Sequence, residues 1–383
     1  MHLENLPNLV VGAGLWGCVL AERIATVLGE RVLVIDRRDH TGGNCHSFLE
    51  EETGIECHAY GTHIFHTSIE RVWEYITQFS RFTQYKHTVL TEYRGRVYQM
   101  PIGLATINDF YGIRLHPYEV AAFIKKEAGK EAGGPANNLE EKAVSLIGRP
   151  LYEAFIKGYT QKQWGRDPRE LPPEIITRLP VRTNYSGEYF TDPWQGLPEQ
   201  GYAALFSRLL AHPRITVKTG VAYEDIAFSV PQTCRVFYSG PLDALFAFSH
   251  GALEWRSLRF EARTEPYADW QGTAVMNQAD VAVPYTRTHE YKHLHPERAH
   301  KVNKTVLVRE YPKTFERGDE PYYPVNTPAN DHLQKRYVAM LEKRAAFIAG
   351  GRLGSYQYMD MDKTIESALS VFDTLQVNAA ARA

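Results

Sequence analysis

The stretch LVVGAGLWGCVLAERIATVLGERVLVID, residues 9–36, contains two apolar segments separated by a glycine turn and a helical pattern. The apolar run at 9–11 has the length of a buried strand, and apolar residues then recur at helical spacing over 15–28. A second, largely apolar run covers 31–35 and ends on Asp36. This order predicts a β-α-β unit with parallel strands, and therefore an α/β fold.

Three glycines in this stretch fit the pattern G-x-G-x-x-G. Gly12 permits the tight turn, Gly14 lets a pyrophosphate approach the backbone, and Gly17 allows the helix to pack on the strand. The pyrophosphate would lie at the positive N-terminus of the helix. Asp36 follows Gly12 by 24 positions and would accept both hydroxyls of an adenosine ribose. We predict a dinucleotide site, and the alternative is a strand–helix turn that binds nothing.

The residues after the acid indicate which dinucleotide binds. The segment RRDHTGGN, residues 37–44, places a glycine pair at Gly42 and Gly43. An acid followed by such a pair resembles the flavoproteins with two dinucleotide-binding domains, in which the pair faces the ribityl and pyrophosphate groups of FAD. We therefore expect FAD as the cofactor.

Composition excludes several classes of function. The 383 residues include 43 Lys and Arg against 45 Asp and Glu, and a net charge of -2 argues against bulk nucleic-acid binding. No apolar run approaches the roughly 18 residues of a membrane span. No basic segment precedes the first apolar run, so a signal peptide is not expected. The four cysteines lack the spacing of a disulfide framework. We expect a cytoplasmic protein without stable membrane association.

The stretch GGNCHSFLEEETGIECHAYGTHIFHT, residues 42–67, contains two cysteines and four histidines and suggests a zinc site. Its Cys-His pairs are adjacent, however, and neighbours on a strand point to opposite faces. The spacing of known zinc ligands is also missing. We therefore expect no metal. His66 reads as a hydrogen-bonded structural residue, whereas His63 should lie near the flavin.

The segment YGTHIFHT, residues 60–67, resembles the flavin-proximal segment of bacterial UDP-galactopyranose mutases, a family of flavin-dependent nucleotide-sugar mutases. Seven further segments resemble this family in the same order along the chain, from about residue 9 to 370. They are MPIGLATIN (100–108), GYTQKQWG (158–165), RLPVR (178–182), YFTDPWQGLPEQGY (189–202), VPYTRTHEYKH (283–293), EPYYPVN (320–326) and GRLGSYQYMDMD (351–362). Flavin motifs alone would also fit amine oxidases, but GYTQKQWG and VPYTRTHEYKH do not.

The resemblance implies that the chain interconverts UDP-galactopyranose and UDP-galactofuranose without net redox change, which would supply galactofuranose for surface glycans. The active cofactor would be reduced FAD, with NAD(P)H or another donor as the reductant, and N5 of the flavin would form a covalent adduct with the sugar. A homodimer is also implied. The alternatives are a mutase for UDP-N-acetylgalactosamine, UDP-arabinose or dTDP-fucose, a flavin oxidoreductase of the amine-oxidase type, and a UDP-sugar-binding flavoprotein without turnover.

The resemblance also implies which residues bind the substrate. Arginine suits a departing diphosphate, because its planar guanidinium matches the phosphate oxygens. The expected substrate residues are Phe155, Tyr159, Thr160, Trp164, Arg178, Tyr189, Arg256, Arg287, Tyr323 and Tyr358. Among these, Arg178 and Arg287 are expected to act in catalysis together with His63. The adjacent Tyr322 remains an alternative to Tyr323.

The residues expected to bind the cofactor come from three segments. They are Gly12, Ala13, Gly14, Trp16, Gly17, Asp36, Arg37, Gly43, Asn44, His63, Ile64, Arg352, Tyr358, Asp360 and Met361. Acidic residues that open a helix are ordinary N-terminal caps, and we interpret Asp362 in that way.

The chain is expected to form a Rossmann-like FAD-binding domain with an inserted helical subdomain and an antiparallel β-sheet domain. The FAD-binding domain should combine 1–80, 205–250 and 345–383, the helical subdomain should cover 100–170, and the sheet domain should combine 81–99, 171–204 and 251–344. Within these, 214–221 and 234–240 should join the parallel sheet, 363–374 should be the last helix, and 164–168 should be a mobile loop over the substrate.

Two features depart from the family pattern. Cys45 and His46 follow the glycine pair where small or aromatic residues are expected, and Thr62 stands where proline is often found before the histidine. Both departures lie on the flavin side, and they leave the identity of the sugar open.

Overall fold

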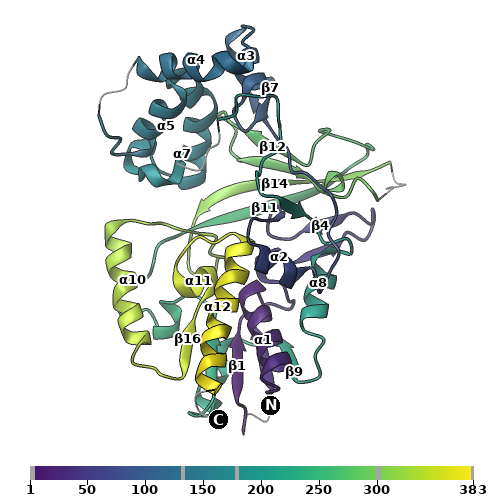
Figure 1. Cartoon of the computed structure of the whole chain (residues 1–383), viewed down its shortest axis with the longest axis vertical. Helices are drawn as coiled ribbons and strands as arrows, with labels where there is room; N and C mark the ends of the chain where they lie inside the picture. The colour runs from purple at the N-terminus through teal and green to yellow at the C-terminus, as the bar shows by residue number, and fades with distance from the viewer. Residues whose placement is uncertain (1–4, 131–133, 177–180, 299–302, 381–383) are drawn as a thin grey trace.

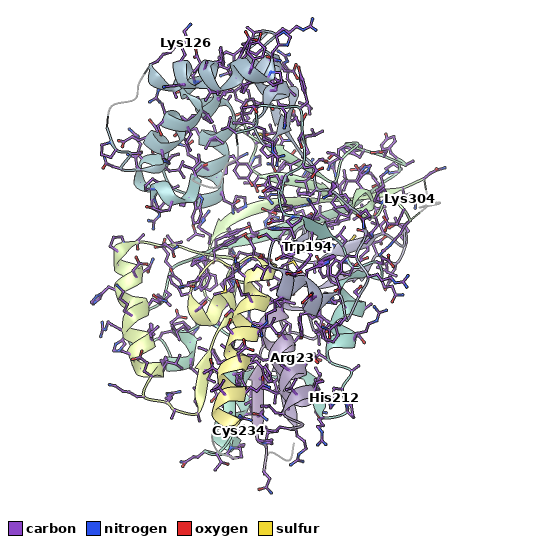
Figure 2. All side chains as sticks on the ribbon, viewed as in Figure 1. Arg23, Lys126, Trp194, His212, Cys234 and Lys304 are labelled. Atoms are coloured by element: carbon purple, nitrogen blue, oxygen red, sulfur yellow. The ribbon has the colours of Figure 1, made fainter. Side chains whose placement is uncertain are left out.

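The computed structural model of the protein describes residues 5–130, 134–176, 181–298 and 303–380. Figure 1 shows three parts along the long axis of the molecule. A parallel sheet with its helices lies at the end that holds both termini, a large twisted sheet lies in the middle, and a group of helices forms the other end. In Figure 2, Lys126 lies on the outer side of these helices and Cys234 lies at the opposite end of the molecule.

The parallel sheet has five strands in the order β16-β10-β1-β2-β9. The strands are β1 (Asn8–Val11), β2 (Val32–Asp36), β9 (Ile215–Thr219), β10 (Arg235–Tyr238) and β16 (Phe347–Ala349). All neighbouring pairs are parallel. Every residue of β1 and β2 is buried, as expected for a parallel sheet. The Rossmann-like α/β fold and the strands predicted near 214–221 and 234–240 are confirmed.

The helices that accompany this sheet include α1 (Leu15–Val27), α8 (Gly201–Leu209), α11 (Gly351–Ser355) and α12 (Met361–Ala380). Helices α1 and α12 lie side by side (Figure 1). The last helix is longer than the predicted 363–374, since no glycine or proline follows Thr374 to end it. Asp362 lies in its first turn, where its carboxylate accepts the backbone N–H of Lys363 at 2.7 Å.

The large sheet has seven strands in the order β15-β11-β14-β13-β12-β6-β7. They are β6 (Val89–Tyr93), β7 (Arg96–Met100), β11 (Trp255–Glu265), β12 (Val275–Gln278), β13 (Arg287–Glu290), β14 (Thr305–Thr314) and β15 (Tyr323–Pro324). The sheet is mixed and not purely antiparallel, because β12 and β6 run parallel. The sequence predicts strands of this sheet within 171–204, but the described residues of that region contribute none. Their strand β8 (Trp194–Gly196) pairs instead with β5 (Phe65–Thr67).

Residues 101–165, for which helices are predicted, are mainly helical. It contains α3 (Leu104–Tyr111), α4 (Pro117–Gly129), α5 (Leu139–Ile147), α6 (Arg149–Leu151), a π-helical stretch at Tyr152–Lys157, and α7 (Gly158–Trp164). The remaining elements are α2 (Glu70–Ile76), α9 (Tyr223–Ile226), α10 (Pro328–Leu341), β3 (Ser47–Leu49) and β4 (Glu56–His58). Short 3-10 turns cover Gly43–Cys45, Pro168–Glu170, Pro173–Ile176, Ala227–Ser229, Ala244–Phe246 and Tyr291–Leu294. Among the helices described, none is both long and apolar enough to cross a membrane.

Candidate active site

The glycine turn between β1 and α1 has the geometry that the sequence predicts. Gly12 has φ +101°, and its N–H donates to the carbonyl of Ile35 at 2.8 Å. A Cβ on Gly17 would lie 2.1 Å from the carbonyl oxygen of Gly12, so only glycine allows the helix this close to the strand. The two glycine motifs also touch, since a Cβ on Gly43 would lie 2.9 Å from Cα of Gly14. At both motifs the backbone is therefore free of side chains, so that a pyrophosphate could approach it.

Asp36 lies at the end of β2 beside this turn. Its side chain is buried, and its carboxylate accepts the backbone N–H of Ala13 at 2.7 Å and that of Arg38 at 2.9 Å. Gly42 donates its own N–H to the carbonyl of Ala13, which joins the second glycine motif to the first. A carboxylate has about four lone-pair sites, so Asp36 keeps acceptor capacity for two ribose hydroxyls. The residues present therefore fit the adenosine and pyrophosphate of FAD.

We expect Asp36→Ala to reduce the FAD content of the purified protein by at least tenfold. The variant loses two hydrogen bonds to a charged acceptor, each worth about 1.5–3 kcal/mol. The absorbance ratio of flavin to protein measures the effect. Asp39→Ala is the matched control, because Asp39 is exposed and lies three positions after the strand ends. An Asp36→Ala protein as yellow as wild type would contradict the assignment.

Of the two arginines after the strand, Arg38 is the one turned inward. Its side chain is 14% exposed, whereas that of Arg37 is 50% exposed. Both pair with Glu320, at 2.6 Å from Arg37 and 2.5 Å from Arg38, and Arg38 also donates to Oδ1 of Asn44 at 2.9 Å. Sequence alone could not choose between adjacent arginines. Trp16, also expected at the cofactor, packs tightly on Gly350, and its buried indole N–H has no hydrogen-bond partner in the structure.

His63 is held in one orientation and one protonation state. Its backbone N–H donates to Nδ1 of His58 at 3.0 Å, and its own Nδ1 lies 2.8 Å from the carbonyl of Gly61. Since a carbonyl only accepts, Nδ1 carries the proton and Nε2 keeps its lone pair. Burial, with a contribution from the charge of Arg352, lowers the pKa of His63 to about 4. The imidazole is therefore neutral at pH 7.

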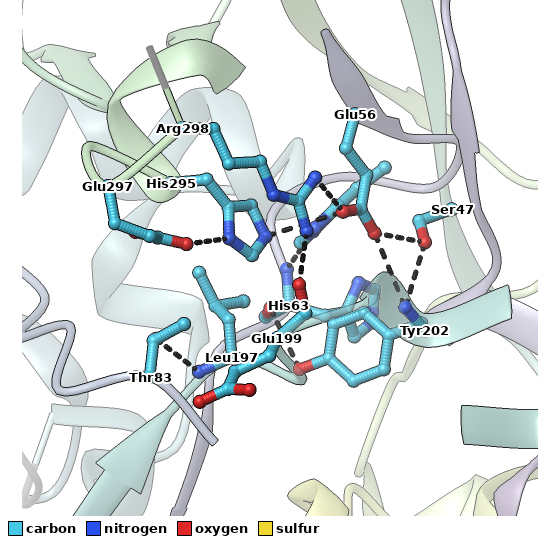
Figure 3. Close-up of polar contacts among 11 residues, drawn as sticks. Ser47, Glu56, His63, Thr83, Leu197, Glu199, Tyr202, His295, Glu297 and Arg298 are labelled. Carbon is cyan, nitrogen blue, oxygen red and sulfur yellow. Dashed lines mark hydrogen bonds and ion pairs between the residues drawn. The ribbon is translucent and has the colours of Figure 1, made fainter. Parts of the chain in front are cut away.

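A buried polar network supports His63 from the other side (Figure 3). Tyr202 donates its hydroxyl proton to the carbonyl of His63 at 3.1 Å, and its backbone N–H contacts Oγ of Ser47 at 3.1 Å. Ser47 in turn donates to Glu56 at 2.6 Å, and Arg298 donates to the same carboxylate at 2.7 Å. These contacts fix the backbone of the segment that precedes β5.

The residues expected to bind the substrate meet around Arg287 at the start of β13. Its guanidinium donates to the hydroxyl of Tyr159 on α7, and its Nε lies 3.4 Å from the carboxylate of Glu310 on β14. Burial would lower the pKa of Arg287, but the charge of Glu310 keeps it well above its ordinary value. The ring of Tyr323 lies 6.4 Å from that of Trp164 and 6.0 Å from that of Tyr358.

Two adjacent tyrosines on and before β15 face different surroundings. The charges of Glu310 and Arg287 influence the pKa of Tyr323, which burial raises above its ordinary value. The ring of Tyr322 instead lies 6.1 Å from Phe260, and its side chain is 4% exposed. We therefore retain Tyr323 as the substrate residue.

Three residues of the candidate set are buried. Phe155 is 3% exposed, and its ring lies 5.0 Å from that of Tyr98 inside the helical region. Thr160 is 7% exposed. Arg256 donates from Nε to the carbonyl of Gln163 at 3.0 Å, which satisfies a free carbonyl at the end of α7. Arg256 is thus bound to the helix that carries Trp164.

The other candidates lie at the edges of this cluster. Tyr189 is 40% exposed, and its backbone N–H donates to the carbonyl of His87 at 2.7 Å. Arg352 lies 4.7 Å from the ring of Tyr358 and donates to the carbonyl of Met359 at 2.8 Å. Ile64 is buried, Asp360 accepts the N–H of Thr364 through its carbonyl, and Met361 lies 3.8 Å from the hydroxyl of Tyr202. Arg178 lies outside the described residues.

The sequence did not reveal Glu310 or Lys162. Glu310 is 2% exposed and faces Arg287 across two paired strands. Lys162 donates to the carbonyls of Gln278, Asp280 and Tyr285 at 2.8–2.9 Å and so ties α7 to the segment before Arg287. Glu310 belongs to none of the motifs, and Lys162 lies within GYTQKQWG, but the contacts of both residues are with segments distant in the sequence.

The cysteines and histidines of 42–67 have separate surroundings. All four cysteines of the chain are free and buried, and burial raises the pKa of Cys45 and of Cys57 to about 12. His46 stacks on His40 at 3.9 Å. His66 pairs with Asp192 at 2.7 Å, as a structural histidine would.

Buried neutral histidines should make folding stability depend on pH. Burial lowers the pKa of His63 to about 4 and that of His87 to about 3, from an ordinary 6.5. Between about pH 6.5 and 4 the unfolded chain binds more protons, so the free energy of unfolding should fall as the pH falls. His293 opposes this trend, because Glu290 raises its pKa.

The measurement is the urea midpoint at pH 7.0 and pH 5.0. We expect a lower midpoint at pH 5.0 and a smaller difference in His87→Gln, which cannot titrate. Equal midpoints for the wild type, or an unchanged difference in the variant, would contradict this account of the histidines.

Comparisons with known proteins identify the family of the chain. A family model described as UDP-galactopyranose mutase matches residues 154–358, and a model described as an NAD(P)-binding Rossmann-like domain matches 10–79. The chain is 40% identical over 371 residues to a probable UDP-galactopyranose mutase of Klebsiella pneumoniae, which covers 97% of this chain and 95% of that protein. It is 36% identical over 366 residues to a dTDP-fucopyranose mutase of Escherichia coli, which covers 94% and 96%.

Solved structures share the fold. A crystal structure of reduced UDP-galactopyranose mutase aligns with a TM-score of 0.74 at 16% identity, over 97% of this chain and 96% of that one. A putative protoporphyrinogen oxidase from Exiguobacterium sp. aligns with a TM-score of 0.64 at 12% identity, over 98% and 99%. The full-length sequence relatives and the family model together show that this chain belongs to the UDP-galactopyranose mutase family of nucleotide-sugar mutases.

Proposed function

We propose that this chain is an FAD-dependent mutase that interconverts UDP-galactopyranose and UDP-galactofuranose without net redox change. The observation that supports this most is Arg287, a half-buried guanidinium whose partners include Tyr159 and whose charge influences the pKa of Tyr323. A planar cation surrounded by phenol groups matches the oxygens of a nucleotide diphosphate. The adjoining glycine turns and Asp36 suit the dinucleotide cofactor.

The leaving diphosphate sets the main task of the protein. Its negative charge is greatest while the sugar is detached, so the groups that hold it must interact most strongly at that stage. We assign this role to Arg287, together with Arg178. Tyr159 accepts a hydrogen bond from Arg287, and its own hydroxyl proton therefore remains available for a phosphate oxygen. Tyr189, Tyr323 and Tyr358 would contribute further neutral donors at the edges of the same cluster.

The uridine would stack on Tyr159 in the first turn of α7 and on Trp164 at its C-terminal end. That end is held by Arg256 and by Gly165, which has φ +64° and caps the helix. Phe155 and Thr160, which are buried, would pack behind these residues. We propose that residues 164–168 move when the substrate binds.

The cofactor would lie between the glycine turns and β13. Reduced FAD, when bound, would supply the nucleophile that takes the anomeric carbon from the diphosphate. His63 would present a neutral Nε2 that accepts a proton or a hydrogen bond at neutral pH. Ile64, Arg352, Tyr358, Asp360 and Met361 would line the flavin side.

The experiment incubates purified protein, reduced with dithionite, with UDP-galactofuranose and in parallel with dTDP-fucofuranose, and separates the products by chromatography. We expect conversion of UDP-galactofuranose to UDP-galactopyranose, since the similarity to the Klebsiella pneumoniae relative is somewhat higher. Exclusive turnover of the dTDP sugar would reassign the substrate. Oxygen consumption without isomerised product would indicate a flavin oxidoreductase and overturn the proposal.

Reduced flavin should be required even though no electron is consumed. The reason is that the flavin nitrogen is nucleophilic only when reduced. We expect enzyme reduced with dithionite or with NAD(P)H to turn over at least a hundredfold faster than fully oxidised enzyme. Equal rates in the two forms would contradict the nucleophilic role.

We also propose that the protein is a homodimer, which sedimentation equilibrium would test.

A further inference from the structure

His289 connects two parts of the candidate active site. It lies on β13 two positions after Arg287, and both side chains therefore point to the same face of the sheet. None of its surface is exposed. Its Nε2 lies 3.2 Å from the carboxylate of Glu310, and its Nδ1 lies 2.7 Å from Oγ1 of Thr62. One ring thus contacts both the partner of Arg287 and the residue before His63.

The partners of His289 determine where its proton lies. The charge of Arg287, with a hydrogen bond from His289, keeps the pKa of Glu310 low although burial would raise it. The ionised carboxylate only accepts, so Nε2 of His289 carries the proton and Nδ1 accepts from the hydroxyl of Thr62. The order of donors is therefore Thr62 to His289 to Glu310, and the carboxylate ends the sequence beside Arg287.

The segment around Thr62 is held on both sides. Gly61 passes close to Glu310, because a Cβ on Gly61 would lie 3.5 Å from the carboxylate. On the other side of Thr62, the backbone N–H of His63 donates to Nδ1 of His58. The rings of His58 and His289 both stack on Tyr291, at 5.4 and 5.5 Å. The segment that carries His63 and the strand that carries Arg287 are therefore packed as one unit.

We propose that His289 is a positioning residue that sets Arg287 through Glu310 and sets the segment of His63 through Thr62. This inference rests on the proposed function, since it takes Arg287 to bind the diphosphate. A threonine at position 62, where the family often has proline, gives this chain a hydroxyl that reaches His289. Thr62, which departs from the family pattern near the expected flavin site, is thus connected through the buried His289 to Glu310 and Arg287 at the expected substrate site.

The test separates the two contacts of the ring. In His289→Gln the amide reaches the position of Nε2 and keeps a donor toward Glu310. In His289→Asn the amide reaches the position of Nδ1 and keeps an acceptor for Thr62. Thr62→Val removes the hydroxyl, Thr62→Ser restores it, and Thr288→Val is the matched control on the opposite face of β13. For each FAD-loaded protein, titration calorimetry measures the Kd of UDP, steady-state assays give kcat and KM, and Tm reports folding.

We expect His289→Asn to weaken UDP binding and raise KM by about tenfold, whereas His289→Gln should keep the Kd of UDP and KM within about threefold of wild type. Thr62→Val should lower kcat by about tenfold with UDP affinity unchanged, and Thr62→Ser should restore it. If the wild type and Thr288→Val bind UDP, Arg287→Ala does not, and all His289 and Thr62 variants behave as wild type, the inference is wrong and the function stands. A wild type that binds no UDP would overturn the proposed function and this inference together.

Discussion

Arg287→Ala is expected to lower kcat and raise KM together, with a loss of about one and a half to four decades in kcat/KM. Truncating one partner of a buried charge contact costs about 2–5 kcal/mol. Both constants should change because the contact strengthens as the diphosphate detaches. Arg287→Lys should restore only part of the activity, since a point charge lacks the planar fork that binds two phosphate oxygens. We expect the same for Arg178.

The matched control for this prediction is Arg309→Ala. Arg309 precedes Glu310 on β14, so its side chain points to the opposite face of the sheet, where it lies 4.8 Å from the ring of Tyr285. It should keep kcat/KM within about threefold of wild type. Near-normal kcat/KM in both Arg178→Ala and Arg287→Ala, with losses in Tyr159 or Trp164 variants, would show that the diphosphate lies elsewhere.

The nucleotide end of the molecule could be predicted because its determinants are local. Gly12, Gly17 and Asp36 act within one β-α-β unit, and their spacing already implies the turn and the buried carboxylate. The strand at 305–314 likewise follows from its β-branched and apolar residues. Local signals of this kind do not depend on where the rest of the chain packs.

The region 171–204 shows how such signals are misread. We expected strands of the large sheet there, but prolines at positions 172, 173, 193 and 198 remove the N–H donors that a central strand needs. Only the short β8 forms among the described residues of this region, and it pairs with β5. The sequence contained this information in its prolines.

The interior of the candidate active site could not be predicted from the sequence. Glu310 faces Arg287 only because β13 and β14 pair in a register that sets these two residues opposite each other. His289 reaches Thr62 only because the segment before β5 crosses the same face. Contacts of this kind depend on tertiary packing. The family resemblance indicated only the residues expected to contact the substrate and the cofactor, and not the residues behind them.

Glu310→Ala is expected to have the largest effect on stability. It leaves the half-buried Arg287 without the buried carboxylate that pairs with it, and removing one partner of a buried pair typically costs about 3–5 kcal/mol. The double variant Arg287→Ala/Glu310→Ala removes both charges and should unfold at a higher urea concentration than Glu310→Ala. Urea unfolding of the two single variants and the double variant gives the coupling energy directly.

UDP provides the sharper part of this prediction. In the wild type Arg287 already has an anionic partner, whereas in Glu310→Ala the diphosphate would replace the one carboxylate that pairs with Arg287 among the described residues. A ligand that binds only the folded state stabilises it by an amount that increases with the logarithm of its affinity. We therefore expect saturating UDP to raise the Tm of Glu310→Ala by more than it raises that of the wild type, while kcat falls at least tenfold because Arg287 loses its orientation. If UDP stabilised the variant less than the wild type, UDP binding would depend on Glu310 through a group other than Arg287. The pairing of Arg287 with Glu310 would then not account for UDP binding.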